Sequence, residues 1–267
     1  MNKRYSVLVA VCVTAALVVT YSGMHISKRI ESDKDGKFPV YSGEELLEPN
    51  VYPYTFIFFG DNRPAKGKEQ PEVFKIIIQM INEDDPLFVI GGGDFVVEGT
   101  PENFEEFLNV VSGLKLPLFY VCGNHDDSTY YEQYLGKRVY AFTYTNSLFV
   151  ILDNSRKILD KEQLNFLEEQ LQKGVEHTFV CLHIPPFDPE GSYSMVNPEE
   201  FMEIILKYKV DYVLCSHIHH FYEEKINSTT FIISGGAGAP LSRGGYYHYV
   251  VIEVGDTITH TVVRCDA

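Results

Sequence analysis

The stretch VCGNHDD, residues 121–127, stands at the end of an apolar run that begins at residue 116. A glycine closes the run, and Asn124, His125 and Asp126 follow at once. Their side chains can bind metal ions or exchange protons. The order predicts a buried strand with these side chains on the loop at its carboxyl end, where layered α/β proteins bind ligands. Gly and Asn are also ordinary turn residues, so the stretch needs support from the rest of the chain.

Two earlier stretches repeat this arrangement. YTFIFF (residues 54–59) leads to Gly60-Asp61, and LFVI (residues 87–90) leads to Gly93-Asp94. Helical apolar spacing over residues 69–82, and a second helix begun by Pro101, lie between the strands. Alternating strands and helices predict parallel strands, which bring Asp61, Asp94 and Asn124 to one edge of the sheet. Helix capping is the alternative role for these three residues.

The second half predicts further strands that end in histidines. A strand over residues 177–182 leads to His183, and one over residues 212–215 leads to His217-Ile218-His219. Around them we expect a hairpin with its turn near Asn146-Ser147, a helix capped by Asp160, and a helix opened by Asn197 as N-cap and Pro198. Two or three antiparallel strands are expected to close the domain, over residues 230–234, 247–254 and 257–263.

Five loops therefore carry groups that can bind metal ions: Asp61; Asp94; Asn124 with His125; His183; and His217 with His219. Carboxylate, amide carbonyl and imidazole ligands suit Mn, Fe or Zn. Thiolates are absent from these positions, which disfavours a closed structural zinc site. A single histidine could equally be solvated or satisfied in a core, but the set as a whole favours a metal centre.

Length and composition limit the classes of protein to which the chain can belong. The chain has 267 residues, of which 45% are hydrophobic, and this suffices for one domain over residues 51–267. The formal net charge of −15 argues against a nucleic-acid groove. An anionic substrate then needs local positive charge, which bound metal ions supply. The sequence does not indicate an oligomeric state.

The N-terminus has the pattern of a targeting segment. Lys3 and Arg4 precede an apolar run over residues 7–19, which predicts a signal peptide or signal anchor over residues 1–26. Residues 27–50 mix both charges with Gly and Pro and predict a linker. The domain is then expected to be membrane-anchored outside the cytoplasm, or exported after cleavage.

In the order of these motifs the chain resembles the calcineurin-like metallophosphoesterase superfamily. Gly60-Asp61, Gly93-Asp94, Gly123-Asn124-His125-Asp126, His183 and His217-Ile218-His219 are similar to its five motifs, over about residues 54–264. The resemblance implies an α/β fold, a four-layer α/β/β/α sandwich of two mixed sheets. It also implies a centre of two divalent or trivalent metal ions at one end of the sheets.

The resemblance assigns roles by position. Asp94 would bridge the metals; the two sites would be completed by Asn124, His183 and His217 on one side and by Asp61 and His219 on the other. His125 would contact the phosphoryl group or protonate the leaving oxygen, with Asp126 as a candidate to orient it. Asn124, His125 and Arg63 are the candidates for substrate contact.

Arg63 departs from the family pattern, which commonly reads Asp-x-His in the first motif. A guanidinium is always protonated and cannot bind a metal. Either waters or Asn62 complete this site, or the site is weak and one ion is held tightly. Arg63 either binds phosphoryl oxygens bidentately, as a catalytic or substrate-binding residue, or pairs with a nearby acid.

The predicted reaction is hydrolysis of a phosphomonoester or phosphodiester by a hydroxide that the metal ions hold and acidify. The alternative is a membrane-tethered binding protein with this fold and weak or absent catalysis. Hydrolysis of a non-phosphorus bond with the same ligands is a third interpretation.

Overall fold

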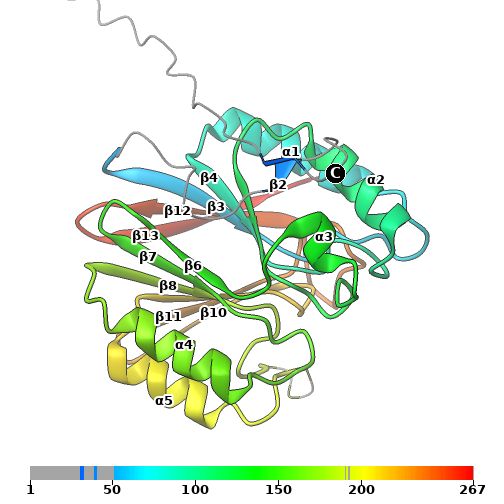
Figure 1. Cartoon of the computed structure of the whole chain (residues 1–267). Coiled ribbons are helices and arrows are strands. Elements are labelled where there is room, and N and C mark those ends of the chain that lie inside the picture. Colours follow the sequence, from blue (N-terminus) through cyan, green and yellow to red (C-terminus); the bar gives the residue numbers. More distant parts are fainter. Residues whose placement is uncertain (1–30, 33–38, 41–50, 190, 192, 267) are drawn as a thin grey trace, which may run out of the picture.

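The computed structural model describes residues 31–32, 39–40, 51–189, 191 and 193–266. Two β-sheets lie face to face, with helices α1 and α2 over the outer face of one and α4 and α5 over the outer face of the other (Figure 1). Both sheets are mixed, because each contains parallel and antiparallel pairs. The predicted α/β arrangement of two mixed sheets with flanking helices is confirmed.

The five-stranded sheet has the order β13-β12-β3-β4-β5. Its strands are β3 (Tyr54–Phe59), β4 (Phe88–Gly91), β5 (Leu118–Tyr120), β12 (His248–Val254) and β13 (Ile258–Arg264). Strands β3, β4 and β5 are parallel, as predicted, and α1 (Glu72–Asp84) and α2 (Pro101–Val111) are their crossovers. Asp61, Asp94 and Asn124 therefore leave the sheet at one edge.

The six-stranded sheet has the order β10-β11-β9-β8-β7-β6. Its strands are β6 (Tyr140–Tyr144), β7 (Ser147–Ile151), β8 (His177–Cys181), β9 (Tyr212–Cys215), β10 (Phe221–Ile226) and β11 (Thr229–Ser234). Strands β7, β8, β9 and β11 are parallel neighbours, so His183 and His217 also follow parallel strands.

Two strands of this sheet differ from expectation. Strand β11 was expected in an antiparallel group; it pairs antiparallel with β10, but in parallel with β9. Strand β10 was not predicted, because its sequence FYEEKI lacks an apolar run. It is an edge strand, and its central Glu223, Glu224 and Lys225 face solvent, as charged residues on sheet edges commonly do.

Helix starts were predicted with mixed success. Asp160 caps α4 (Lys161–Leu171) by accepting from the Gln163 amide at 2.9 Å, as expected. The N-cap of α5 (Glu199–Tyr208) is Pro198, so the prediction of Asn197 as N-cap was wrong. Asn197 has φ +53°, a left-handed backbone that differs from the extended conformation of most N-caps.

The turn of the hairpin between β6 and β7 falls at residues 145–146, one residue earlier than expected. The remaining helix is α3 (Tyr131–Leu135).

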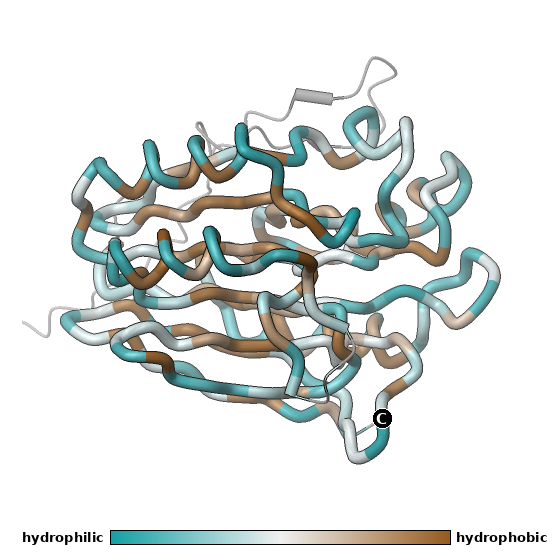
Figure 2. Tube along the Cα trace, turned by 90° about the horizontal axis from the view of Figure 1, so that it is seen from below, coloured by the Kyte–Doolittle hydropathy of each residue, from teal (hydrophilic) through white to brown (hydrophobic). Residues whose placement is uncertain are grey.

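Three apolar layers hold the domain together. Residues on one side of β3, such as Ile57 and Phe59, pack against α1 and α2, while Phe56 and Phe58 point between the sheets. The inter-sheet layer is rich in stacked rings, including Phe149 with Phe179 at 4.7 Å between centroids. Figure 2 shows apolar segments along the strands and alternating colours along the helices. Burial on both faces explains why the strand sequences are continuous apolar runs.

The predicted N-terminal segment, residues 1–26, lies outside the described residues. Within the predicted linker, the short strands β1 (Glu31–Ser32) and β2 (Pro39–Val40) pair antiparallel. Across the ranges that the structure describes, none of the helices combines the length and apolar content needed to span a bilayer.

Candidate metal centre

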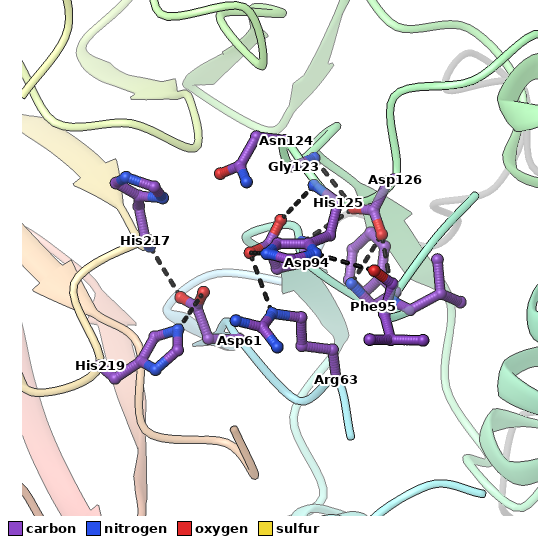
Figure 3. Close-up of polar contacts among 12 residues, drawn as sticks. Asp61, Arg63, Asp94, Phe95, Gly123, Asn124, His125, Asp126, His217 and His219 are labelled. Carbon is purple, nitrogen blue, oxygen red and sulfur yellow. Dashed lines mark hydrogen bonds and ion pairs between the residues drawn. The ribbon is translucent and has the colours of Figure 1, made fainter. Parts of the chain in front are cut away.

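The predicted ligand residues converge at one end of the two sheets (Figure 3). Each lies on a loop that directly follows a strand: Asp61 after β3, Asp94 after β4, Asn124 after β5, His183 after β8, and His217 and His219 after β9. The parallel strands of each sheet deliver their loops to a common edge, and the face-to-face packing of the sheets joins the two edges. The structure thus brings the six predicted metal-binding residues together.

The first ligand group, as we call it, consists of Asp94, His183 and His217. One ligand atom from each side chain lies within 4.8 Å of the others. His183 Nε2 is 3.3 Å from Asp94 Oδ1 and 3.2 Å from the side-chain oxygen of Asn124. Asn124 therefore stands beside this group as a further oxygen ligand.

The second ligand group consists of Asp61, Asp94 and His219, again with ligand atoms within 4.8 Å of one another. His219 Nε2 lies 3.3 Å from Asp61 Oδ1. The Asp94 carboxylate belongs to both groups. A shared carboxylate is the arrangement that allows two cations to be held side by side.

Backbone carbonyls set the tautomers of two ligand histidines. His183 Nδ1 lies 2.8 Å from the Gly92 carbonyl oxygen, and His219 Nδ1 lies 2.7 Å from that of Pro240. A carbonyl can only accept, so each Nδ1 carries a proton and donates it. Each Nε2 is then left for a metal, which is the usual way in which proteins orient ligand histidines.

The loops hold the carboxylates in strained but braced conformations. Asp61, Asp94 and His217 have φ values of 57°, 57° and 69°, a region that costs a non-glycine residue about 1–3 kcal/mol. The His217 amide donates to Asp61 Oδ2 at 2.7 Å, and the His125 amide donates to Asp94 Oδ1 at 2.9 Å. These bonds fix the direction of both carboxylates, which is the preorganisation that a ligand site needs.

The protonation states suit cation binding. Burial opposes ionisation of Asp94, but the neighbouring His183 and His125 outweigh it and lower its pKa. Burial, together with His183, lowers the pKa of His217 to about 4, so this ring is neutral at pH 7. Burial also disfavours charge on His183, yet Asp94 raises its pKa to about 9. A cation that binds His183 would displace this proton.

Two buried atoms test whether the residues fit a metal ion. Asp61 Oδ1 and His217 Nε2 have no hydrogen-bond partner among the described residues. An unsatisfied buried polar group costs about 1–3 kcal/mol, and coordination of a cation would remove that cost. The carboxylate, amide and imidazole donors match Mn, Fe or Zn. The residues present therefore fit the predicted kind of metal ion.

His125 belongs to neither ligand group. Its Nδ1 lies 2.8 Å from the Val97 carbonyl oxygen, and its Nε2 lies 3.9 Å from Asp94 Oδ2. The side chain is 33% exposed, and it lines a cavity of about 350 Å³. Because Val97 fixes the proton on Nδ1, the Nε2 atom is the one presented to the cavity.

Asp126 is buried and accepts from four backbone amides: Asp94, Phe95, Val96 and Gly123, at 2.8, 2.8, 3.2 and 2.9 Å. Burial and the adjacent Asp94 carboxylate raise the pKa of Asp126, while the amide donors act against this. Gly123 permits the close approach, since a Cβ there would lie 2.1 Å from the Asp94 nitrogen. The geometry is that of a brace for the Asp94 loop; the catalytic role predicted for Asp126 stays a prediction.

Arg63 lies beside the shared carboxylate. Its Nε is 3.4 Å from Asp94 Oδ2, and its side chain is 15% exposed. The predicted pairing with a nearby acid is therefore observed, and contact with a substrate stays a prediction. Asn62 is buried and donates to Gln70 Oε1 at 2.8 Å.

The rest of the cavity wall was not foreseen from the sequence. Tyr193, Ser242 and Arg243 line the cavity together with the ligand residues. They lie in irregular loops whose sequence has no periodicity to place them. His248 is fully buried and is not among the residues that line the cavity.

Several known proteins are similar to this chain. A family model described as calcineurin-like phosphoesterase matches residues 54–221. A 3′,5′-cyclic-nucleotide phosphodiesterase of Nostoc is 23% identical over 189 residues, which are 64% of this chain and 71% of that protein. A probable cyclic nucleotide phosphodiesterase of Rhodopseudomonas palustris is 27% identical over 61% of this chain and 68% of its own length. Among solved structures, a purple acid phosphatase from yellow lupin (Lupinus luteus) superposes with a TM-score of 0.65 at 16% identity, over 80% of this chain and 53% of that one.

Proposed function

The chain belongs to the calcineurin-like phosphoesterase family, and we propose that it hydrolyses a phosphodiester at a centre of two metal ions. Family membership confirms the sequence-based interpretation as a metal-dependent phosphoester hydrolase. The choice of a diester, the number of ions and the residue roles are our proposal.

One observation carries the proposal: two ligand groups share the Asp94 carboxylate at the wall of a cavity. Metal ions bound there would neutralise charge on phosphoryl oxygens and acidify a water molecule. Asp94 supports both groups, and Asn124, His183 and His217 complete the first.

His125 is the proposed proton donor to the leaving oxygen. Its Nδ1 proton is committed to the Val97 carbonyl, so the exchangeable proton is the one on Nε2, on the cavity side. An imidazole changes charge near neutral pH, which suits general acid catalysis of an alkoxide departure. The lack of any place for His125 in the ligand groups leaves its ring available for this task.

Cyclic nucleotides are the first substrate class to examine. The two relatives described above carry names that specify cyclic nucleotide phosphodiesterases. The cavity of about 350 Å³ falls within the range in which proteins bind small ligands. Phosphomonoesters, the other class that the sequence admits, form the comparison.

The test is hydrolysis by the full-length chain loaded with Mn²⁺, with a 3′,5′-cyclic nucleotide, an aryl phosphodiester and an aryl phosphomonoester as substrates. We expect turnover of the diesters and a loss of about 100-fold or more in Asn124→Ala. Asn109→Ala is the matched control, because Asn109 is exposed on α2 and does not line the cavity. Metal-loaded protein that cleaves none of the three esters would instead favour the binding-protein alternative.

The location of the domain is a separate proposal. We infer from the basic residues and apolar run of the N-terminus that the domain is anchored outside the cytoplasm or exported. A fusion of residues 1–50 to a reporter active only after export should show activity, and a fusion in which Leu8 and Val9 are replaced by Asp should not. Equal activity of the two fusions contradicts the proposal.

A further inference from the structure

The two ligand groups differ in the charge that surrounds them. The first contains Asp94, His183 and His217 and has the uncharged Asn124 side-chain oxygen beside it. The second has the permanently charged Arg63 guanidinium beside it. We propose that the first group binds its metal ion tightly, whereas Arg63 keeps the ion of the second group weak and exchangeable and supplies fixed positive charge in its place. This inference rests on the proposed metal-dependent function.

The two oxygens of Asp94 face different neighbours. Oδ1 lies 3.3 Å from His183 Nε2 and accepts from the His125 amide, so it points into the first group. Oδ2 lies 3.4 Å from Arg63 Nε. The oxygen left for the second group is therefore the one that already has a cation beside it. A metal ion on Oδ2 would be held close to a like charge, which weakens its binding.

The backbone keeps Arg63 in this position. The Arg63 amide donates to the Asp94 carbonyl at 3.0 Å, and the Asp61 amide donates to the Gly93 carbonyl at 3.0 Å. These bonds join the loop after β3 to the loop after β4. The guanidinium cannot lose its charge by deprotonation. Within the described part of the chain, Asp94 is the carboxylate at ion-pair distance from Arg63.

The Arg63 side chain is also placed to contact the phosphoryl oxygens of a substrate. Arg63 lines the cavity; its buried Nε faces Asp94 Oδ2, and its Nη1 donates to the Pro64 carbonyl at 3.4 Å. Guanidinium groups bind phosphoryl oxygens through paired N–H donors. Arg243, which is remote from Arg63 in the sequence, lines the same cavity. Two arginines and one tight ion would thus compensate the charge of a phosphodiester in a protein of net charge −15.

The test measures metal binding without substrate. The full-length chain is freed of metal with a chelator and dialysed against a series of buffered free Mn²⁺ concentrations, and bound manganese is counted by elemental analysis. We expect one equivalent to bind first and the second to require a free Mn²⁺ concentration higher by about tenfold or more. In Arg63→Gln the second midpoint should fall by about tenfold, because the charge is gone.

Three variants control this experiment. Arg63→Lys keeps the charge and should keep the wild-type pattern, and Arg63→His adds a ligand and should give two nearly equal midpoints. Arg156→Gln removes an exposed arginine that pairs with Asp127 and should leave both midpoints unchanged. Far-UV circular dichroism and melting temperature verify that each variant is folded.

The proposal is overturned if wild-type protein fills both sites at the same free Mn²⁺, or if folded Arg63→Gln retains the wild-type midpoints. The outcome is separable from that of the proposed function. Unequal binding of two ions by a chain that cleaves no ester would refute the hydrolase and leave the inference on Arg63 in place. Cleavage by a chain with two equal sites would do the reverse.

Discussion

The first and second ligand groups share Asp94, and each has two buried ligand residues and one half-buried one. They differ in the histidine that lies 3.3 Å from a carboxylate of its group, His183 in the first and His219 in the second. His183 in the first group has a side chain with 0% exposure and is held by the Gly92 carbonyl of the opposite sheet. His219 in the second group is 18% exposed and is held by Pro240 in a loop. The fully buried His183 ring resists displacement, whereas the partly exposed His219 ring can adapt. This difference favours tighter metal binding in the first group.

The charge around each group differs in the same sense. The Arg63 guanidinium stands at 3.4 Å from the Asp94 oxygen that faces the second group. The first group has instead an amide oxygen from Asn124. The difference between these two histidines and the difference in charge therefore act in the same direction, and both predict that the first group is the stronger metal site. The following experiments test this prediction.

The largest effect is expected from Asp94→Asn, because Asp94 is common to both groups. We predict loss of at least one equivalent of bound metal and a fall in kcat of about 1,000-fold, or about 4 kcal/mol. Asn tolerates the left-handed backbone at this position, so the fold should survive. Elemental analysis and steady-state kinetics are the measurements, with the exposed Asp85→Asn as control. Retention of both ions and of activity would show that Asp94 is not the shared ligand.

The second effect separates the groups directly. His183→Ala should lower kcat by about 100-fold or more and remove the tight ion, while His219→Ala should cost about 10-fold and leave the tight ion in place. The reason is that each variant deletes one imidazole from one group only. Manganese titration and kinetics on the same samples decide between them. If His219→Ala loses the tight ion, the ranking of the two groups is reversed.

The third effect concerns the brace beneath both groups. Asp126→Asn replaces a carboxylate that accepts from four amides by a group with a single acceptor oxygen. Removal of the charge beside Asp94 offsets part of the loss, and we predict a net cost of about 2 kcal/mol in unfolding free energy, or a drop of about 6 °C in Tm. Thermal unfolding, again with Asp85→Asn as control, is the measurement.

The same variant distinguishes a brace from a catalytic group. A brace for Asp94 should weaken both metal midpoints in proportion, and kcat should recover when excess Mn²⁺ is supplied. If Asp126→Asn keeps its wild-type Tm and metal content but loses activity, the catalytic role predicted from the sequence is supported instead.

The smallest effect is expected at the rim above the first group. Tyr193 is 54% exposed, and its ring lies 6.2 Å from that of His217. We predict that Tyr193→Ala raises KM about threefold for a diester that carries an aromatic base and leaves kcat and metal content unchanged. Tyr130→Ala, at a similarly exposed tyrosine outside the cavity, is the matched control. An unchanged KM would mean that the substrate does not extend over this rim.

Local sequence patterns were sufficient for much of the architecture. The buried strands before Asp61, Asp94, Asn124, His183 and His217 were predicted because short apolar runs that end in glycine or a polar residue reflect burial on both faces of a sheet. The two features that were missed or predicted wrongly, strand β10 and the N-cap of α5, also have local causes. Strand β10 lacks the apolar pattern because it is an exposed edge, and Asn197 takes a left-handed backbone although it is a common N-cap residue.

The order of residues along the chain already indicates which chemical groups this protein can bring to a metal centre and in what order the loops present them. The packing of the fold was needed to show which carboxylate oxygen faces Arg63, and that the carbonyls of Gly92, Val97 and Pro240 set the histidine tautomers. Every residue carries a carbonyl, so no pattern of side chains can mark the few that act. Periodicity records short-range burial, whereas distances of 3–4 Å between loops remote in sequence arise from the packing of two sheets against each other.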